Sequence, residues 1–247
     1  MTTFVLVPGA GGQAWYWHRL VAELERRGHR ALAVDLPAGD DSAGLAAYAD
    51  AVVDAIGPRS PVVLVAHSMG GLTAPLVCER VQVELLVLVN AMIPLPGETG
   101  STWWTATGQG EAQAAHWAGL GLPGEPDDDV AFFHDVPDDV VAAARDRPFA
   151  QSTRPFEDPW PLTCWPDVPT RVLAGRDDRL FPAGFQRTVA AERLGLDVDE
   201  IPGGHLVALS RPAELADHLE SYRHSGGATR RVAARTQRGP DAARHRA

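Results

Sequence analysis

A serine in a tight turn is the first candidate for chemistry in this sequence. Ser68 stands in the stretch Ala-His-Ser-Met-Gly-Gly at 66–71, after an apolar, β-rich run at 61–65 and before a run of helical character at 72–81. A strand, a sharp turn and a helix, with small residues two before and two after the serine, are typical of a turn that exposes a nucleophilic hydroxyl. The same residues also fit an ordinary strand–helix turn in which the serine caps the helix. Ser68 is therefore a candidate nucleophile whose role depends on a base and an acid elsewhere in the chain.

Candidates for that base and acid follow two later strands. A serine hydroxyl is a weak nucleophile, so it needs a general base, and the base needs an acid that orients it. His205 lies in a Pro-Gly-Gly-His-Leu loop after the last predicted strand, and Asp177 and Asp178 follow the strand before it. Because open α/β sheets place their sites at the carboxyl ends of strands, these side chains are expected near Ser68. The residues themselves leave Asp177 as a competitor to Asp178. The other histidines fit the role of base less well, because they lie on helices, in the middle of the chain, in the C-terminal segment or beside the serine: His18, His29, His67, His116, His134, His218, His224 and His245.

The order serine, aspartate, histidine, each after its own strand, is the order of a catalytic triad in one fold. Over residues 3–223 the chain resembles the α/β-hydrolases, and within them the small-esterase branch that also contains plant hydroxynitrile lyases and methyl-ester esterases. The stretches that carry this resemblance are Val-Leu-Val-Pro-Gly-Ala at 5–10, Gly-His-Arg at 28–30, Asp-Leu-Pro at 35–37, the stretch at 66–71, Gly-Arg-Asp-Asp at 175–178 and Gly-Gly-His at 203–205. The resemblance implies that Ser68, Asp178 and His205 form the triad. It also implies that the backbone N–H groups of Ala10 and Met69 form the oxyanion hole.

The sequence departs from that branch at three points. Pro8 stands before the glycine where the family usually has histidine, which changes the support of the oxyanion loop. The first predicted strand matches the third strand of the family, so a sheet of about six strands is expected. The hydroxynitrile lyases of the family rely on a lysine, and this chain contains no lysine.

Strands and helices alternate along two parts of the chain, 1–91 and 166–223. Such alternation predicts an α/β fold with a mostly parallel sheet flanked by helices. Strands are predicted at 3–7, 30–34, 61–65, 84–90, 170–174 and 197–201. Helices are predicted at 16–28, from a cap at Asp41 or Ser42 to 56, and at 72–81, 182–194 and 211–223.

Residues 92–165 interrupt this alternation and are predicted to be an inserted helical lid. They are rich in glycine and proline, hold five of the seven tryptophans, and show helical pieces at about 101–118 and 137–146. The aromatic side chains fit either an apolar pocket wall over Ser68 or the small core of the insertion itself. These aromatic side chains are Trp103, Trp104, Trp117, Phe132, Phe133 and Trp160. The residues predicted to line the substrate pocket are Trp103, Trp104, Trp117, Phe133 and His134, the last of which, with Asp135, could also add an acid–base pair.

No metal or cofactor is expected. The acidic runs at 127–129 and 138–139 are more typical of helix N-termini than of metal ligands. The two cysteines, Cys78 and Cys164, suggest neither a disulfide scaffold nor a metal site.

Composition narrows the class of protein further. The 247 residues carry a formal net charge of −10, which argues against nucleic-acid binding. Residues 224–247 are rich in arginine, glycine and alanine and are predicted to be a disordered basic tail.

The N-terminus shows no basic segment typical of a signal peptide, and no apolar run approaches the ~20 residues of a membrane span, so a cytoplasmic protein is expected. The sequence does not decide between a monomer and a homodimer.

The hypothesis that follows is a serine hydrolase acting on a carboxylic ester, or lactone, of a small to medium apolar molecule through an acyl-enzyme. One alternative is other chemistry on the same scaffold, such as lyase, C–C bond hydrolysis, acyl transfer or cyclisation. The other is a ligand-binding receptor that retains the triad.

Overall fold

A six-stranded sheet forms the centre of the molecule in the computed structural model, which describes residues 1–122, 124 and 127–224. The strand order is β2-β1-β3-β4-β5-β6, and every neighbouring pair is parallel. The strands are β1 (Thr3–Val7), β2 (Arg30–Ala33), β3 (Val62–His67), β4 (Val83–Val89), β5 (Thr170–Gly175) and β6 (Val198–Ile201). The predicted α/β fold with about six strands is confirmed, and each strand lies within three residues of its expected ends.

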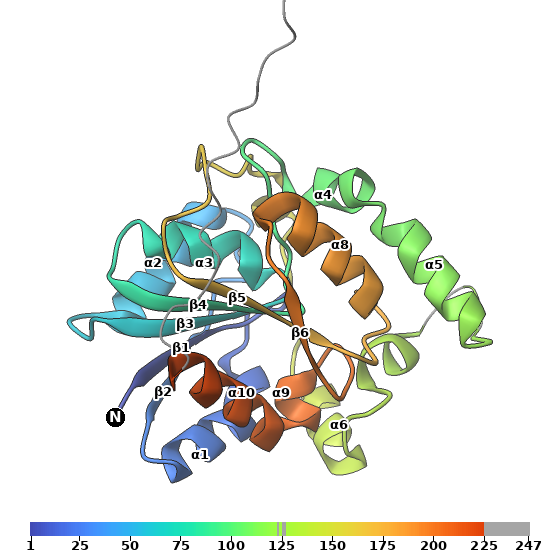
Figure 1. Cartoon of the computed structure of the whole chain (residues 1–247), viewed down its shortest axis with the longest axis horizontal. Coiled ribbons are helices and arrows are strands. Elements are labelled where there is room, and N and C mark those ends of the chain that lie inside the picture. The colour runs from blue at the N-terminus through green and yellow to red at the C-terminus, as the bar shows by residue number, and fades with distance from the viewer. Residues whose placement is uncertain (123, 125–126, 225–247) are drawn as a thin grey trace, which may run out of the picture.

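Helices cover both faces of this sheet. Figure 1 shows α2, α3 and α8 against one face and α1, α9 and α10 against the other. Their bounds are α1 (His18–Arg26, preceded by the 3₁₀ turn η1, Ala14–Trp17), α2 (Leu45–Ile56), α3 (Gly70–Cys78), α8 (Ala183–Leu194), α9 (Val207–Ser210) and α10 (Pro212–His224). Helix α3 continues through Pro75, although proline removes one backbone donor from a helix.

Two apolar cores result from the alternation of side chains along the strands. Val5 and Leu64 point to the face of α2, α3 and α8, whereas Phe4 and Val63 point to the face of α1 and α10. Strands buried on both faces read as continuous apolar runs, as β3 and β4 do.

The segment 92–165 lies between β4 and β5 and forms short helices. They are α4 (Gly100–Thr107), α5 (Gln109–Gly119), the π-type turn η2 (Asp129–Phe133), α6 (Asp138–Arg145) and α7 (Arg154–Glu157). The helical region expected at about 101–118 consists of two helices, because Gly108 adopts φ +67° and separates α4 from α5. The basic tail predicted at 224–247 lies, apart from His224, outside the described residues.

The start of α2 also differs from the prediction. Neither Asp41 nor Ser42 caps this helix; Gly44 precedes it, and the N–H of Leu45 donates to Asp158 Oδ2 at 2.9 Å. A Cβ on residue 44 would lie 2.0 Å from that same oxygen, so only glycine lets the carboxylate approach. The cap therefore comes from the inserted segment, more than a hundred residues away.

Candidate active site

The serine predicted as nucleophile sits at the turn between β3 and α3. Ser68 has φ +51°, a left-handed conformation that non-glycine residues rarely adopt and that costs backbone energy. Small neighbours make the turn possible: a Cβ on Gly70 would lie 2.7 Å from Pro8 O, and one on Gly71 would lie 2.0 Å from Met92 O. This strained turn thus holds the Ser68 hydroxyl between the end of β3 and the start of α3.

His205 and Asp178 lie beside that hydroxyl in one hydrogen-bonded line. His205 Nε2 is 3.0 Å from Ser68 Oγ, and His205 Nδ1 is 2.8 Å from Asp178 Oδ2. Asp178 is fully buried and His205 is 1% exposed. The second carboxylate oxygen of Asp178 accepts the N–H groups of Leu180 and Phe181 at 2.8 and 2.9 Å. These bonds fix the carboxylate, which accepts the Nδ1 proton and leaves Nε2 free to accept the serine proton.

Asp177, the competing acid, has a different role. Its side chain is half exposed, pairs with Arg176 and accepts the N–H of Gly203 at 3.1 Å. It therefore holds the loop before His205 by its backbone and does not reach the histidine ring. The tertiary structure selects Asp178 as the partner of His205.

Asn90 is a further buried residue at this site, and the sequence reading did not single it out. It follows β4, has φ +46°, and its amide Nδ2 donates to the carbonyls of Gly204 and His205 at 3.2 and 2.9 Å. Its Oδ1 accepts the N–H of Gly175, at the end of β5, at 2.6 Å. One side chain thus joins the strand that leads to Asp178 to the loop that carries His205. The one local signal was a polar residue directly after an apolar strand.

His67, next to the serine, supports His205 from the other side. Its Nε2 donates to the backbone carbonyl of His205 at 2.9 Å, and its ring stacks on Tyr16 with centroids 4.3 Å apart. Burial lowers the pKa of His67 well below its ordinary value, and the neighbouring His205 acts in the same direction. His67 therefore stays neutral and acts as a donor to the backbone of the base.

The loop after β1 lies directly against the serine. A Cβ on Gly9 would come within 2.8 Å of Ser68 Cβ, so a glycine is needed there. Among the described residues, the N–H groups of Ala10 and Met69 have no hydrogen-bond acceptor, whereas the N–H of Gly11 donates to Gln151 Oε1 at 2.8 Å. Pro8 cannot provide a polar side chain here, and the inserted segment supports this loop through Gln151 instead.

A pocket of about 160 Å³ opens beside this loop. Its walls are mostly apolar and aromatic, and they come from the loop after β1, from η1, from the inserted segment and from the residues after His205. The lining residues are Pro8, Gly9, Ala10, Gly11, Gln13, Trp15, Tyr16, His67, Phe133, Ala144, Arg147, Phe149, Leu206 and Leu209.

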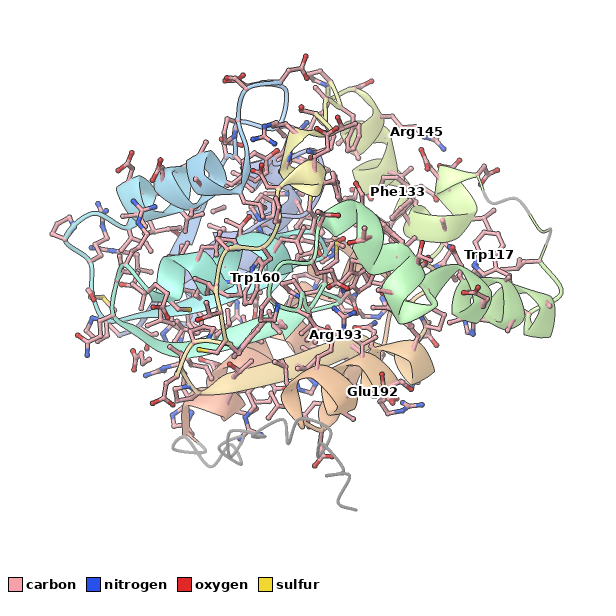
Figure 2. All side chains as sticks on the ribbon, turned by 90° about the horizontal axis from the view of Figure 1, so that it is seen from above. Trp117, Phe133, Arg145, Trp160, Glu192 and Arg193 are labelled. Carbon is pink, nitrogen blue, oxygen red and sulfur yellow. The ribbon has the colours of Figure 1, made fainter. Side chains whose placement is uncertain are left out.

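Of the five residues predicted to line a pocket, Phe133 is in this lining and the other four are not. Trp103 and Trp117 are 1% and 2% exposed, and their indole N–H groups donate to the carbonyls of Ile93 and Arg179. Trp104 packs edge-on against Trp103, and Trp103 packs against Phe181 within the apolar core on the face of α2, α3 and α8. These tryptophans therefore attach the insertion to the main core and do not line this pocket. Figure 2 labels Phe133 and Trp117 on separate elements of the segment, η2 and α5.

His134 and Asp135 contact the site only through backbone atoms of its loops. His134 Nε2 donates to the carbonyl of Asp177 at 2.9 Å, and Asp135 Oδ2 accepts the N–H of Gly204 at 2.9 Å. Burial, with a smaller contribution from Arg179, lowers the pKa of His134. The pair thus clamps the loops that carry Asp178 and His205.

The acidic runs at 127–129 and 138–139 lie at the starts of helices or form ion pairs. Asp127 Oδ1 accepts the N–H of Val130, Asp129 pairs with Arg145, and Asp138 and Asp139 stand in the first turn of α6. In the described part of the chain, no group of three or more histidine, cysteine or acidic side chains is arranged to hold a metal ion. Within that same part, every helix is too short or too polar to cross a membrane.

The chain resembles known proteins in sequence and in fold. A family model described as the alpha/beta hydrolase family matches residues 4–218. The probable esterase PIR7A of Oryza sativa subsp. indica is 38% identical over 107 residues, covering 38% of this chain and 41% of that protein. Polyneuridine aldehyde esterase of Rauvolfia serpentina is 33% identical over 108 residues, covering 39% of this chain and 41% of that protein. The chain thus spans about two fifths of the length of these curated relatives.

A solved structure agrees over nearly the whole chain. The crystal structure of a pyrethroid hydrolase from Sphingobium faniae JZ-2 superposes with a TM-score of 0.70 and 24% identity, covering 91% of this chain and 98% of that one. This likeness shows that the two chains share one fold. With the family model matching residues 4–218, the chain belongs to the alpha/beta hydrolase family.

Proposed function

We propose that this protein is a serine hydrolase that cleaves carboxylic esters of small, apolar molecules through an acyl-enzyme. The observation that carries the proposal is the line of hydrogen bonds from Ser68 Oγ through the His205 ring to Asp178, on a strained turn at the sheet edge. The esterase names of the partial relatives support the same reaction class.

In this reaction Ser68 attacks the ester carbonyl while His205 Nε2 takes its proton. Asp178 holds the imidazole through Nδ1 and stabilises the imidazolium that forms. His205 then gives the proton to the departing alcohol, which leaves an acyl group on Ser68. Water, activated by the same histidine, releases the acid and restores the serine.

The negative oxygen of the tetrahedral intermediate needs donors that are already in place. The N–H groups of Ala10 and Met69 are assigned this role, because Met69 follows Ser68, Ala10 follows the Gly9 that packs against Ser68, and neither N–H has an acceptor among the described residues. The start of α3 adds the favourable end of the helix dipole.

The inserted segment 92–165 is assigned the role of a lid. Phe132 packs edge-on to the His205 ring at 5.6 Å, and Phe133 and Phe149 line the neighbouring pocket. These side chains would exclude water from the acyl-enzyme until it is needed. Both cysteines are free, which is compatible with a cytoplasmic location.

The test is active-site labelling combined with turnover. Wild type should react with a fluorophosphonate probe and hydrolyse p-nitrophenyl acetate, whereas Ser68→Ala should lose the label and at least ~10³-fold in kcat. Ser101→Ala, which changes an exposed serine on α4, should behave as wild type. Equal labelling of wild type and Ser68→Ala, or labelling without turnover of any ester, would contradict the proposal.

A further inference from the structure

The size of the pocket beside Ala10 limits what it can hold. Its volume is about 160 Å³, and an engineered apolar cavity of about 150 Å³ in another protein binds benzene. The aromatic residues Trp15, Tyr16, Phe133 and Phe149 face it from several sides. Such a space fits one six-membered ring or a branched chain of similar size.

The charge of the pocket is uneven. Arg147 is its one cation, and none of the residues that line it is acidic. His67, which also lines it, is kept neutral by burial. The protein as a whole carries a net charge of −10, so a positive group at this place opposes the general trend of the surface.

Arg147 is held in position without a carboxylate partner. Its guanidinium lies over the Trp15 ring, 4.8 Å from the ring centroid. The residue after it is tied down as well, because Gln13 Nε2 donates to the carbonyl of Pro148. Among the described residues no acidic side chain pairs with Arg147, whereas Arg145, at the end of α6, pairs with Asp129.

A stacked arginine keeps its N–H edges available for an anion. A guanidinium binds a carboxylate by two parallel hydrogen bonds, and stacking on an indole leaves that edge free. Because Arg147 is exposed to solvent, its pairing with an anion is expected to raise the binding affinity only modestly, and the increase should depend on salt concentration.

We propose that this pocket binds the single-ring part of an ester that carries an anionic substituent, with Arg147 as the counter-ion. The inference rests on the proposed ester hydrolysis for its biological meaning. The binding site itself does not, because an unreactive anionic ring should occupy the same place.

The first experiment therefore measures binding without catalysis. Benzoate and its neutral analogue benzamide are titrated into the full-length protein by calorimetry. Wild type should bind benzoate more tightly than benzamide. Arg147→Gln should lower the affinity for benzoate about fivefold to tenfold and leave the affinity for benzamide unchanged. Raising the ionic strength to about 1 M should lower the affinity of wild type for benzoate and leave that of Arg147→Gln unchanged.

Arg145→Gln is the matched control, because it removes the same charge two residues away and Arg145 is not a lining residue. Figure 2 labels Arg145, at the end of α6. This variant should leave both affinities as they are in wild type. Equal affinities of wild type for benzoate and benzamide, or an unchanged benzoate affinity in Arg147→Gln, would overturn the inference.

The second experiment separates this inference from the proposed function. Two pairs of esters are compared, methyl benzoate with monomethyl terephthalate and phenyl acetate with 4-acetoxybenzoate. In at least one pair, Arg147→Gln should lower kcat/KM for the anionic ester about fivefold to tenfold and spare the neutral one. If kcat/KM is the same in wild type and Arg147→Gln for both pairs, the anion subsite is contradicted and the proposed hydrolase activity is not. Arg147-dependent benzoate binding with no turnover of any of the four esters supports the subsite and counts against the hydrolase.

Discussion

At the scale of single residues, the site depends on buried polar side chains that act through the backbone. Asn90, His67 and Gln186 surround the loops of Asp178 and His205, and Gln186 Nε2 donates to Asn90 Oδ1 at 3.1 Å and to Phe181 O at 2.7 Å. A buried polar group is costly unless it is hydrogen-bonded, so a network of this kind holds one arrangement of the loops. The positions of Asp178 and His205 are therefore set by neighbours that hold the backbone of their loops.

Asn90 is predicted to be a positioning residue. Asn90→Asp keeps the shape and tolerates the positive φ of residue 90, but it loses both donors to the carbonyls of Gly204 and His205. We expect kcat for an ester to fall about 10- to 100-fold with KM nearly unchanged, because small misplacements of catalytic groups are costly.

A residue that only stabilises the fold would lower the free energy of unfolding and leave kcat of the folded protein unchanged. Asn90→Gly, which removes the side chain and accepts φ +46° without strain, should lower kcat as Asn90→Asp does, again with KM nearly unchanged. Wild-type kcat in folded Asn90→Asp would show that this amide does not position the site.

At the scale of elements, the inserted segment is joined to the core by a few specific contacts. Asp158 caps α2, Gln151 accepts an N–H of the loop after β1, and Trp160 Nε1 donates to the carbonyl of Leu72 in α3. The ion pair between Arg193 of α8 and Glu98, just before α4, adds to these. The two side chains are 8% and 9% exposed, and Arg193 also donates to the carbonyl of Ile93 at 2.6 Å.

Removing one partner of this ion pair should destabilise the protein strongly. Arg193→Met leaves the Glu98 carboxylate buried without its counter-ion, and we expect a loss of about 3 kcal/mol or more in the free energy of unfolding. Urea denaturation followed by circular dichroism measures it. The neighbouring exposed residue of α8 gives the control: Glu192→Gln should change stability by less than about 0.5 kcal/mol (Figure 2).

A double variant tests the cause. Glu98→Gln with Arg193→Met should be more stable than Arg193→Met alone, because the unpaired charge is gone. Equal stability of Arg193→Met and Glu192→Gln would mean that the pair contributes nothing to anchoring the segment.

At the scale of the whole molecule, two apolar cores enclose the sheet and the site lies at its carboxyl edge. The order β2-β1-β3-β4 reverses direction between β1 and β3, which places the loop after β1 beside the turn after β3. Ligands of open α/β sheets bind at such a point. Burial at this edge also couples the overall stability to pH, because His67 is enclosed there as a neutral ring.

The pH dependence of unfolding should carry the signature of His67. Burial lowers its pKa in the folded state, so the unfolded chain binds more protons at acidic pH, and stability must rise with pH. The full stability is present above the unfolded pKa of about 6.5 and is lost below it, by up to about 1.4 kcal/mol per pH unit from this group. Urea unfolding of wild type and His67→Gln at a series of pH values from neutral to mildly acidic should show a flatter curve for the variant. Parallel curves would contradict this assignment.

Much of the fold was predictable from sequence because the central strands are buried on both faces. Continuous apolar runs such as 84–90 have few alternatives to a central parallel strand, and the alternation of strands with helices leaves few topologies. The meeting of Ser68, His205 and an aspartate follows from the same rule, since all three stand after parallel strands. The choice of Asp178 came only from the resemblance to a family, and the structure shows its cause in the buried geometry.

The contacts that the sequence did not predict join residues far apart along the chain. The cap of α2 by Asp158, the bond of Gln151 to Gly11 and the role of Asn90 join residues 85 to 140 positions apart, and no local pattern encodes such pairings. The tryptophans of the insertion show the same limit, because an apolar side chain serves a core or a pocket equally well until packing decides which. Local sequence therefore determined the strands, the turn and the candidate side-chain types, through periodicity and backbone sterics. Tertiary packing alone decided which acid faces the histidine, what supports the loop after β1 and which aromatics line the pocket, because these depend on burial and on distances between distant segments.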